Sequence, residues 1–519
     1  MPTTNPLREG LIAQRVPAPC TMVIFGASGD LNKRKLIPAL YSLSRDRLLP
    51  NAFAVVGYAR RPLPEWVPEM REACNQFARK RPVEADVWDH LAEGMSYVQG
   101  EFDNLDHYKA LKEHLEKIDR ERGTQGNRVF YLSTPPSYYA TIIEHLGKAG
   151  LINKSGGAPF TRVIVEKPFG TDLKTAQELN GVVQGVLRED QTYRIDHYLG
   201  KETVQNIFVL RFGNSLFEPL WNSKYIDSVQ LTVAEAIGIE GRGGYFEEAG
   251  MTRDMVQNHM FQFFALMAME PPIAFEADAI RDEKAKVLRS LRPLAPADVA
   301  RDTVRAQYGE GAASGEKKGG YKSEKGVAAD SVTETYVAMK VHIDNWRWAG
   351  VPFYIRAGKA LAKKVTEIAI QFKQAPPLYW GDQQALSGEH RARGMSGIQE
   401  PNGLTIRIQP DEGISLRFTS KVPGQSLEVT PVSMEFRYGS SFGAEPPEAY
   451  ERLLLDCLLG DSTLFTRADE VEASWRWIDN MFRGWKEANV PLAKYAFGDW
   501  GPAESDELLG RDGRTWRRP

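Results

Sequence analysis

Cysteine is scarce in this sequence, with three residues among 519, and Cys20, Cys74 and Cys457 are widely spaced and form no CxxC pair. This scarcity argues against a disulfide framework or a structural zinc site, and it fits a reducing compartment. Long apolar runs are also lacking, and Met1–Cys20 contains no hydrophobic signal region. We therefore expect a cytoplasmic protein that does not insert into a membrane.

An excess of charge of either sign is absent as well. The 65 Lys and Arg residues nearly balance the 68 Asp and Glu residues, which gives a formal net charge of −3. No attraction of the whole chain to nucleic acid or to acidic membranes is expected from this balance. Apolar residues make up 42% and charged residues 26%, as in an ordinary globular protein long enough for two or three cores.

A glycine turn between a predicted strand and a predicted helix is the first motif. The apolar run Thr21–Phe25 is followed by Gly26-Ala-Ser-Gly-Asp-Leu and then by leucines at helical spacing. This is the context of a dinucleotide-binding loop, in which Gly26 and Gly29 allow close approach of a pyrophosphate and Ser28 can donate a hydroxyl. Asn32 stands where a third glycine is usual, so a plain strand-to-helix turn remains the alternative.

The end of the second predicted strand bears on the choice of coenzyme. Phe53–Val56 leads into Gly-Tyr-Ala-Arg60-Arg61, where NAD-binding folds usually carry an acidic residue for the ribose 2′-hydroxyl. Two arginines suit a 2′-phosphate, which a carboxylate would repel. The sequence therefore favours NADP over NAD, with dual use of both coenzymes and plain surface charge as the alternatives.

Three further apolar runs of strand length complete an α/β pattern: Val129–Leu132, Arg162–Val165 and Tyr193–Ile195. Ligands of open α/β sheets bind beyond the carboxyl ends of the strands, so Lys167 is placed to meet substrate and nicotinamide together. Its Glu-Lys-Pro context resembles a motif of sugar dehydrogenases with Rossmann domains, and this resemblance implies a sugar oxidoreductase more than it implies any one substrate. We predict a Rossmann-like NADP-binding domain over residues 1–198.

The densest group of functional side chains lies in Arg194–Glu202, directly after the last of these strands. It contains the carboxylate of Asp196, the imidazole of His197, the phenol of Tyr198 and the ammonium of Lys201, and Arg194 adds a second cation. Such a cluster suits a small anionic substrate, because cations hold a phosphate and a carboxylate can orient a base placed elsewhere. A solvated surface turn is the alternative.

The hydrophobic period changes after Gly200. Apolar and polar residues alternate in six runs, at Val229–Val233, Val337–Ile343, Ile368–Phe372, Leu404–Ile408, Ile414–Phe418 and Val432–Tyr438. Alternation of this kind is typical of an antiparallel sheet with unlike faces. We predict a larger β+α domain with a big antiparallel sheet over residues 199–519, serving substrate binding and dimerisation.

Two polar stretches of the second half are candidate site segments. Thr252–His259 opens a long apolar helix over Met260–Met269, and a lone histidine there is more often a satisfied core residue. The concentration of Arg, Asp, Gln, Asn and His at one end of that helix favours a site instead. The basic stretch Arg356–Lys364 is either a plain loop or a set of ammonium groups that close on a sugar phosphate.

Taken together, these motifs resemble the glucose-6-phosphate dehydrogenase family, most specifically over Arg194–Glu202. The resemblance covers nearly the whole chain and implies a Rossmann-like coenzyme domain followed by a β+α domain. It also implies a large sheet that commonly forms a homodimer face, so a homodimer or homotetramer is expected. The implied reaction oxidises D-glucose 6-phosphate at C1 to 6-phospho-D-glucono-1,5-lactone and reduces NADP, as the first step of the oxidative pentose phosphate pathway.

Residue roles follow from the same resemblance. It implies that His259 is the general base for the C1 hydroxyl and that Asp196 holds and polarises its imidazole. It implies phosphate binding by His197 and Lys201, with Tyr198 beside them. The remaining implied contacts are Glu235, Asp254, Lys359 and Lys364 to the sugar, Lys167 to both ligands, Gly26, Ser28, Gly29, Asp30 and Arg60 to the coenzyme, and more weakly Gln409 to the substrate. Lys363 could take the place of Lys364.

No metal ion is expected, because hydride passes to the coenzyme and the lactone carbonyl needs no Lewis acid; the histidine and cysteine spacing indicates no metal site. Two other functions stay open at this stage. One is a dehydrogenase of the same architecture that acts on another sugar or sugar phosphate. The other is a catalytically silent NADP-binding sensor, which would have no use for His259, Asp196 and the lysines together.

Overall fold

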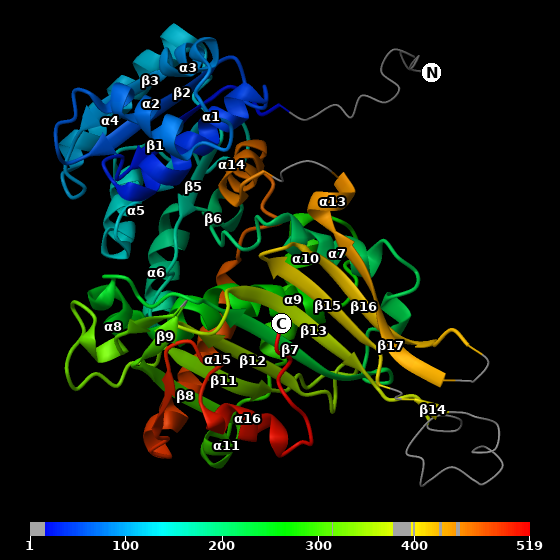
Figure 1. Ribbon diagram of the computed structural model, residues 1–519. Helices are drawn as coiled ribbons and strands as arrows, with labels where there is room; N and C mark the ends of the chain where they lie inside the picture. Colours follow the sequence, from blue (N-terminus) through cyan, green and yellow to red (C-terminus); the bar gives the residue numbers. More distant parts are fainter. Residues whose placement is uncertain (1–15, 314, 377–395, 398–399, 425–427, 443–446) are drawn as a thin grey trace, which may run out of the picture. The chain divides into compact units, whose positions relative to one another are not determined.

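The computed structural model describes residues 16–313, 315–376, 396–397, 400–424, 428–442 and 447–519 (Figure 1). Internal contacts divide the chain into two compact units. The first unit comprises Met1–Gly170, Lys174–Gly200 and Pro447–Ala468, and the second comprises Thr171–Leu173, Lys201–Pro446 and Asp469–Pro519. The late segment Pro447–Ala468 joins the first unit because its helix α14 (Ala449–Leu459) packs against α1 (Ile37–Arg45).

A six-stranded parallel sheet forms the centre of the first unit, with the strand order β3-β2-β1-β4-β5-β6. The strands are β1 (Cys20–Phe25), β2 (Phe53–Ala59), β3 (Met95–Gln99), β4 (Arg128–Leu132), β5 (Thr161–Val165) and β6 (Thr192–Arg194). Every residue of β1, β2 and β4 is buried, as near-continuous apolar runs require of a sheet covered on both faces. The predicted Rossmann-like fold is confirmed, although the half-exposed edge strand β3 escaped the sequence pattern.

Amphipathic helices flank this sheet: α2 (Trp66–Phe77), α3 (Ala85–Ala92), α4 (Leu105–Arg122), α5 (Tyr139–Lys148) and α6 (Leu173–Val186). In α4 the buried residues recur at helical spacing. The side chain of Asn104 accepts from the Asp106 amide at 3.0 Å and caps the helix start, while Gly123 ends it in the left-handed conformation with φ 72°. The helix boundaries are therefore set by local side-chain chemistry.

The second unit contains a ten-stranded sheet among its described residues, in the order β14-β17-β16-β15-β13-β7-β12-β11-β8-β18 (Figure 1). Its strands are β7 (Ile226–Ala234), β8 (Thr303–Gly309), β11 (Tyr336–Val341), β12 (Phe353–Gly358), β13 (Val365–Phe372), β14 (Ser396–Gly397), β15 (Gly403–Gln409), β16 (Gly413–Lys421), β17 (Glu428–Arg437) and β18 (Leu492–Ala496). Each of the six predicted alternating runs falls on one of these strands, although Val337–Ile343 runs two residues past the end of β11 and Val432–Tyr438 one residue past the end of β17. Three of the strand pairs are parallel, so the sheet is mixed and not purely antiparallel. The sequence could not predict these parallel pairs, because alternation indicates that the two faces of a strand differ and not the direction in which the strand runs.

A buried helical segment lies against this sheet. The π-helix η6 (Thr252–Met260) continues into α9 (Phe261–Ala268), and every residue of α9 is buried. The rings of Phe264 and of Phe353 in β12 meet edge to face with centroids 5.1 Å apart, so α9 fixes the end of η6 against the sheet. Among the described residues, every helix is too short or too polar to cross a membrane.

Candidate functional site

The predicted site residues of the first unit gather at one edge of its sheet. The strands are parallel, so residues that follow β1, β2, β5 and β6 all lie at the carboxyl edge. The glycine turn follows β1, Arg60 follows β2, Lys167 follows β5, and Asp196, His197 and Tyr198 follow β6. This edge is where open α/β sheets bind their ligands, and β1 and β4 meet at its topological switch point.

Gly26 is required by its surroundings. Its φ is +82°, and a Cβ atom at this position would lie 2.2 Å from the carbonyl oxygen of Ser133. Asn32, in place of the usual third glycine, is buried and donates its carboxamide to the carbonyl of Ala27 at 2.8 Å. The Asn32 side chain thus holds the turn at the position where other dinucleotide-binding loops have a glycine for close packing of helix against strand. Ser28, at the tip of the turn, is exposed.

The basic residues after this turn are already neutralised. Each of three cations is paired with a carboxylate: Lys33 with Glu69 at 2.9 Å, Arg34 with Asp30 at 2.8 Å and Lys35 with Glu448 at 2.8 Å. The predicted coenzyme residue Asp30 therefore faces Arg34 across an exposed turn of helix. These pairs support a solvated helix face at residues 33–35, and they leave backbone amides and the Ser28 hydroxyl as the donors of the loop.

Arg60 has different surroundings. Its exposed guanidinium lies over the rings of Phe102 and Tyr138, at 5.7 and 5.6 Å from their centroids, and donates to the Tyr138 hydroxyl at 3.3 Å. No carboxylate pairs with Arg60 within the described ranges. A cation that is held by aromatic rings and forms no ion pair with a carboxylate is available to bind a phosphate.

The Glu-Lys-Pro motif brings a half-buried acid next to Lys167. Glu166 accepts hydrogen bonds from the hydroxyls of Tyr131 at 2.5 Å and Tyr450 at 3.2 Å. Burial raises the pKa of the Glu166 carboxyl, and these two hydroxyls and the Lys167 charge oppose part of that shift. The Lys167–Pro168 peptide is cis. Sequence reasoning missed Tyr450, which no local signal connects to a motif almost three hundred residues earlier.

His197 is held between aromatic rings of the first unit. Its ring lies parallel to that of Tyr450, with centroids 6.4 Å apart and an interplanar angle of 9°, and 5.0 Å from that of Tyr198. The carboxylate of Asp196 accepts from the Tyr198 amide at 2.9 Å, which fixes its orientation at the strand end. Imidazole, phenol and carboxylate are therefore presented together after β6.

Arg194 does not belong with these groups. Its guanidinium is 3% exposed and forms an ion pair with Glu189 at 2.6 Å. It also lies 4.7 Å from the centroid of the Phe169 ring. The second cation that the sequence suggested for the substrate is thus a buried structural group, because its partner and its ring contact are already in place.

In the second unit, Lys201 and Gln409 meet. Lys201 is the N-cap residue of α7 (Glu202–Phe212), and its ammonium donates to the side-chain oxygen of Gln409 at the end of β15. The Gln409 amide in turn donates to the Thr366 hydroxyl at 3.0 Å. Gln409, the weaker of the two predicted substrate contacts, therefore lies next to Lys201.

Glu235 and Lys359 form an ion pair in the same unit. They directly follow the parallel neighbours β7 and β12, whose register places Ala234 beside Gly358. The amide of Glu235 also donates to the Gly358 carbonyl at 2.9 Å. Lys359 is 2% exposed, so its ammonium is both buried and paired, and two predicted sugar contacts are joined at one strand edge.

Asp254 and His259 lie within η6, where the sequence pattern predicted an ordinary helix. Hydrogen bonding in a π-helix runs from residue i to i+5, so these two residues, five apart, lie on successive turns. Asp254 accepts from the Tyr245 hydroxyl at 3.1 Å, and His259 is 1% exposed. A π-helical segment is a recurrent feature of functional sites, and no sequence signal announced it here.

Lys363 and Lys364 are both exposed immediately before β13. Neither side chain forms a hydrogen bond or ion pair with any described residue. Both ammonium groups are therefore available to a ligand at this strand start.

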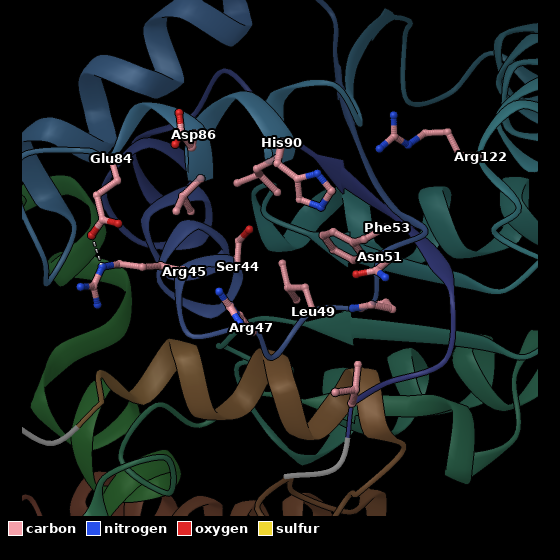
Figure 2. Close-up of a pocket in the computed structure, with 14 residues that line it drawn as sticks. Ser44, Arg45, Arg47, Leu49, Asn51, Phe53, Glu84, Asp86, His90 and Arg122 are labelled. Carbon is pink, nitrogen blue, oxygen red and sulfur yellow. Dashed lines mark hydrogen bonds and ion pairs between the residues drawn. The ribbon is translucent and has the colours of Figure 1, made fainter. Parts of the chain in front are cut away.

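A pocket of about 830 Å³ lies at the opposite, amino edge of the first sheet, near the start of β2 (Figure 2). Arg47 and three further basic residues line it, and those three, Arg45, His90 and Arg122, stand in the last turns of α1, α3 and α4, where helix dipoles favour cations. Arg45 is also paired with Glu84 at 2.6 Å. The three helix-terminal residues thus have structural explanations, and the pocket lies far along the strands from the predicted site residues of this unit.

Two family profiles together match nearly the whole chain. Residues 23–206 match the profile described as glucose-6-phosphate dehydrogenase, NAD binding domain, and residues 208–517 match the C-terminal domain of the same enzyme. A glucose-6-phosphate 1-dehydrogenase of Chlamydia pneumoniae is 49% identical and covers 99% of both chains. A glucose-6-phosphate 1-dehydrogenase 2 of Mycobacterium tuberculosis is 47% identical over 99% of this chain and 98% of its own.

Solved structures agree with these sequence relatives. A glucose-6-phosphate dehydrogenase in complex with its substrate glucose-6-phosphate has a TM-score of 0.85 and 35% identity, covering 98% of this chain and 100% of its own. A glucose-6-phosphate 1-dehydrogenase from Mycobacterium avium has a TM-score of 0.80 and 36% identity, covering 97% and 99%.

Proposed function

The chain belongs to the glucose-6-phosphate dehydrogenase family, and we propose that it oxidises D-glucose 6-phosphate at C1 to 6-phospho-D-glucono-1,5-lactone with NADP as the hydride acceptor. The observation that carries this proposal is the full-length identity of 49% to a glucose-6-phosphate 1-dehydrogenase. The presence of Arg194–Glu202 and of His259 in one chain supports it, because both segments supply reactive groups.

The first unit fits a nicotinamide dinucleotide. The φ of Gly26 and the 2.2 Å approach of a hypothetical Cβ to Ser133 mark a turn built for a bare backbone. Gly26, Ser28 and Gly29 would hold the pyrophosphate, with Asp30 completing the turn. Bound coenzyme supplies the hydride acceptor.

Arg60 supports NADP as the preferred coenzyme. Its guanidinium follows β2, where NAD-binding folds usually carry an acid, and it is stacked on aromatic rings without a carboxylate partner in the described chain. A 2′-phosphate would gain charge-assisted hydrogen bonds there, whereas a bare 2′-hydroxyl would gain little.

Removal of the C1 hydroxyl proton is assigned to His259. An imidazole has a pKa suited to taking a proton near neutral pH, and hydride leaves C1 only as that proton is removed. Asp196 is assigned to orient the imidazole in the working enzyme and to stabilise its protonated form. The assignment explains why a carboxylate with a fixed orientation follows β6 and why a histidine stands in a buried π-helix.

Substrate binding is assigned to cations at the phosphate and to polar pairs at the sugar. His197 and Lys201 would hold the phosphate, with Tyr198 beside them, and Lys167 would contact both ligands. Glu235, Asp254, Lys359 and Lys364 would contact the sugar hydroxyls, with Gln409 as a weaker contributor. Binding energy from a phosphate remote from C1 fixes the orientation of the reacting carbon and lowers the barrier.

A homo-oligomer and a cytoplasmic location complete the proposal. Met434 on β17 is 62% exposed, and β16 and β17 bury few residues, which supports a sheet face that is covered by a second copy. All three cysteines are free and buried, which supports a reducing compartment.

The assignment of His259 is tested by the variant His259→Asn. We expect turnover to fall by about three orders of magnitude or more, because no base remains, while the dissociation constant for glucose 6-phosphate stays nearly unchanged. The measurement is steady-state coenzyme reduction together with isothermal titration by the sugar phosphate. Normal turnover in this variant would remove the base assignment, and equal activity of the wild type on unphosphorylated glucose would argue for a different sugar substrate.

A further inference from the structure

Glu334 is a buried carboxylate to which none of the roles above is assigned. It is 7% exposed and lies two residues before β11 in the second unit. Its side-chain Oε1 accepts from the amide of Thr252 at 3.1 Å, and its carbonyl accepts from the amide of Met251 at 3.0 Å. Both donors lie at the start of η6, the segment that carries His259.

Gly250 leaves room for this contact. Its φ of +62° and ψ of 177° break the helix just before η6. A Cβ atom at Gly250 would lie 2.7 Å from Oε1 of Glu334, and the three nearest atoms all belong to that carboxylate. The carboxylate is therefore packed directly against the backbone at the point where the helical register of η6 is set.

The next residue, Thr335, contacts Lys359, which follows β12. Its carbonyl accepts from the amide of Lys359 at 3.0 Å. The hydroxyl of Tyr495 lies 3.0 Å from the Thr335 hydroxyl and donates to the Lys359 carbonyl at 2.8 Å. Lys359 is in turn paired with Glu235. One dipeptide thus contacts both η6 and the strand edge that carries this ion pair.

The start of a helix needs such an anchor. Its first amides have no partner within the helix, and an acceptor with negative charge satisfies them and complements the helix dipole. A π-helix is rare and occurs mostly as short stretches within α-helices, so contacts outside the segment are expected to hold its register. The far end of η6 is fixed by the buried helix α9, so Glu334 supplies the fixed point at the near end.

We propose that Glu334 is a positioning residue that sets the register of η6, and with it Asp254 and His259, relative to Lys359 and Glu235. It contacts neither substrate nor reacting atoms in this role. The kinetic part of the inference rests on the proposed function, since it takes oxidation of glucose 6-phosphate as its readout.

The first test compares Glu334→Ala with Glu334→Gln, which keeps an acceptor oxygen for the Thr252 amide. We expect Glu334→Ala to lower kcat per folded molecule about tenfold or more, because a small displacement of a catalytic group is costly. Glu334→Gln should restore most of the loss. The KM for NADP should stay unchanged, and the primary isotope effect with substrate deuterated at C1 should rise as the chemical step becomes limiting.

A matched control is Glu324→Ala. Glu324 is a half-buried carboxylate of the second unit, and it accepts from the Tyr308 hydroxyl at 2.9 Å but makes no hydrogen bond to the described residues of η6. This control should change thermal stability but not the isotope effect. Wild-type kcat in Glu334→Ala, or a loss that follows only the folded fraction, would overturn the proposal. If Glu334→Ala does not fold, Glu334→Asp, whose carboxylate is withdrawn by one methylene, faces the same criteria.

Hydrogen exchange separates this inference from the proposed function. In Glu334→Ala or Glu334→Asp, the amides of Met251 and Thr252 and those along η6 should exchange faster, whatever the enzyme oxidises. Unchanged protection of these amides would refute the register role even if the wild type oxidises glucose 6-phosphate. Faster exchange in the Glu334 variants, together with a folded wild type that does not oxidise glucose 6-phosphate, would refute the proposed function and leave the register role standing.

Discussion

Arg60→Ala is expected to weaken the use of NADP much more than the use of NAD. The guanidinium of Arg60 is exposed and makes one hydrogen bond, to the Tyr138 hydroxyl at 3.3 Å, besides its contacts with the rings of Phe102 and Tyr138. A 2′-phosphate would therefore displace only a weak neutral interaction. The whole gain of a charge-assisted contact is available to NADP and absent for NAD.

The size of the effect follows from that environment. A hydrogen bond to a charged group contributes about 1.5–3 kcal/mol. At about 1.4 kcal/mol for each factor of ten, Arg60→Ala should raise the KM for NADP by about ten- to a hundredfold. Solvent exposure places the expected value toward the lower end of that range. The KM for NAD and the KM for glucose 6-phosphate should change little, because neither ligand carries a 2′-phosphate.

The assay is initial-rate reduction of each coenzyme at saturating glucose 6-phosphate, repeated at two salt concentrations. Arg61→Ala is the matched control, since Arg61 is exposed beside Arg60 and its carbonyl accepts from the Tyr97 hydroxyl. Added salt should narrow the difference between wild type and Arg60→Ala, because the lost interaction is ionic. Equal loss with both coenzymes, or an equal effect of Arg61→Ala, would refute the reasoning.

Three further outcomes are expected. Tyr450→Phe removes one donor to Glu166 and should lower the free energy of unfolding by about 0.5–1.5 kcal/mol in urea titrations, with a value near zero contradicting the contact. Gly26→Ala would force a Cβ against the Ser133 carbonyl and should abolish detectable coenzyme binding in fluorescence titrations of folded protein; retained affinity would contradict the loop geometry. Burial lowers the pKa of His114, so its stabilising contribution is present above about pH 6.5 and is lost as pH falls from there toward the lowered pKa. His114→Gln should flatten the dependence of the urea midpoint on pH in that window, and an unchanged slope would contradict the shift.

The sequence predicted those features that local periodicity encodes. The buried strand β1, the turn at Gly26 and the alternation along β7 each reflect a pattern of a few residues, and each appears in the structure. Parallel strand order then placed Lys167 and Asp196 at the same edge as the glycine turn, because chain direction fixes which strand ends coincide.

Other features depend on partners distant in the chain, and a local pattern cannot report these. The ring of Tyr450 faces His197 only because Pro447–Ala468 folds onto the first unit. Arg194 resembled a substrate cation until its pairing with Glu189 was visible. The π-helical conformation around His259 is equally hidden, because no local pattern in Thr252–Met260 distinguishes it from an ordinary α-helix.

The most direct test of the account is the near-ultraviolet absorbance of reduced coenzyme, followed with purified protein, glucose 6-phosphate and either NADP or NAD. Rapid reduction of NADP that needs the phosphorylated sugar, with slower reduction of NAD, is the result that the account predicts. Folded protein that reduces neither coenzyme with glucose 6-phosphate would contradict it.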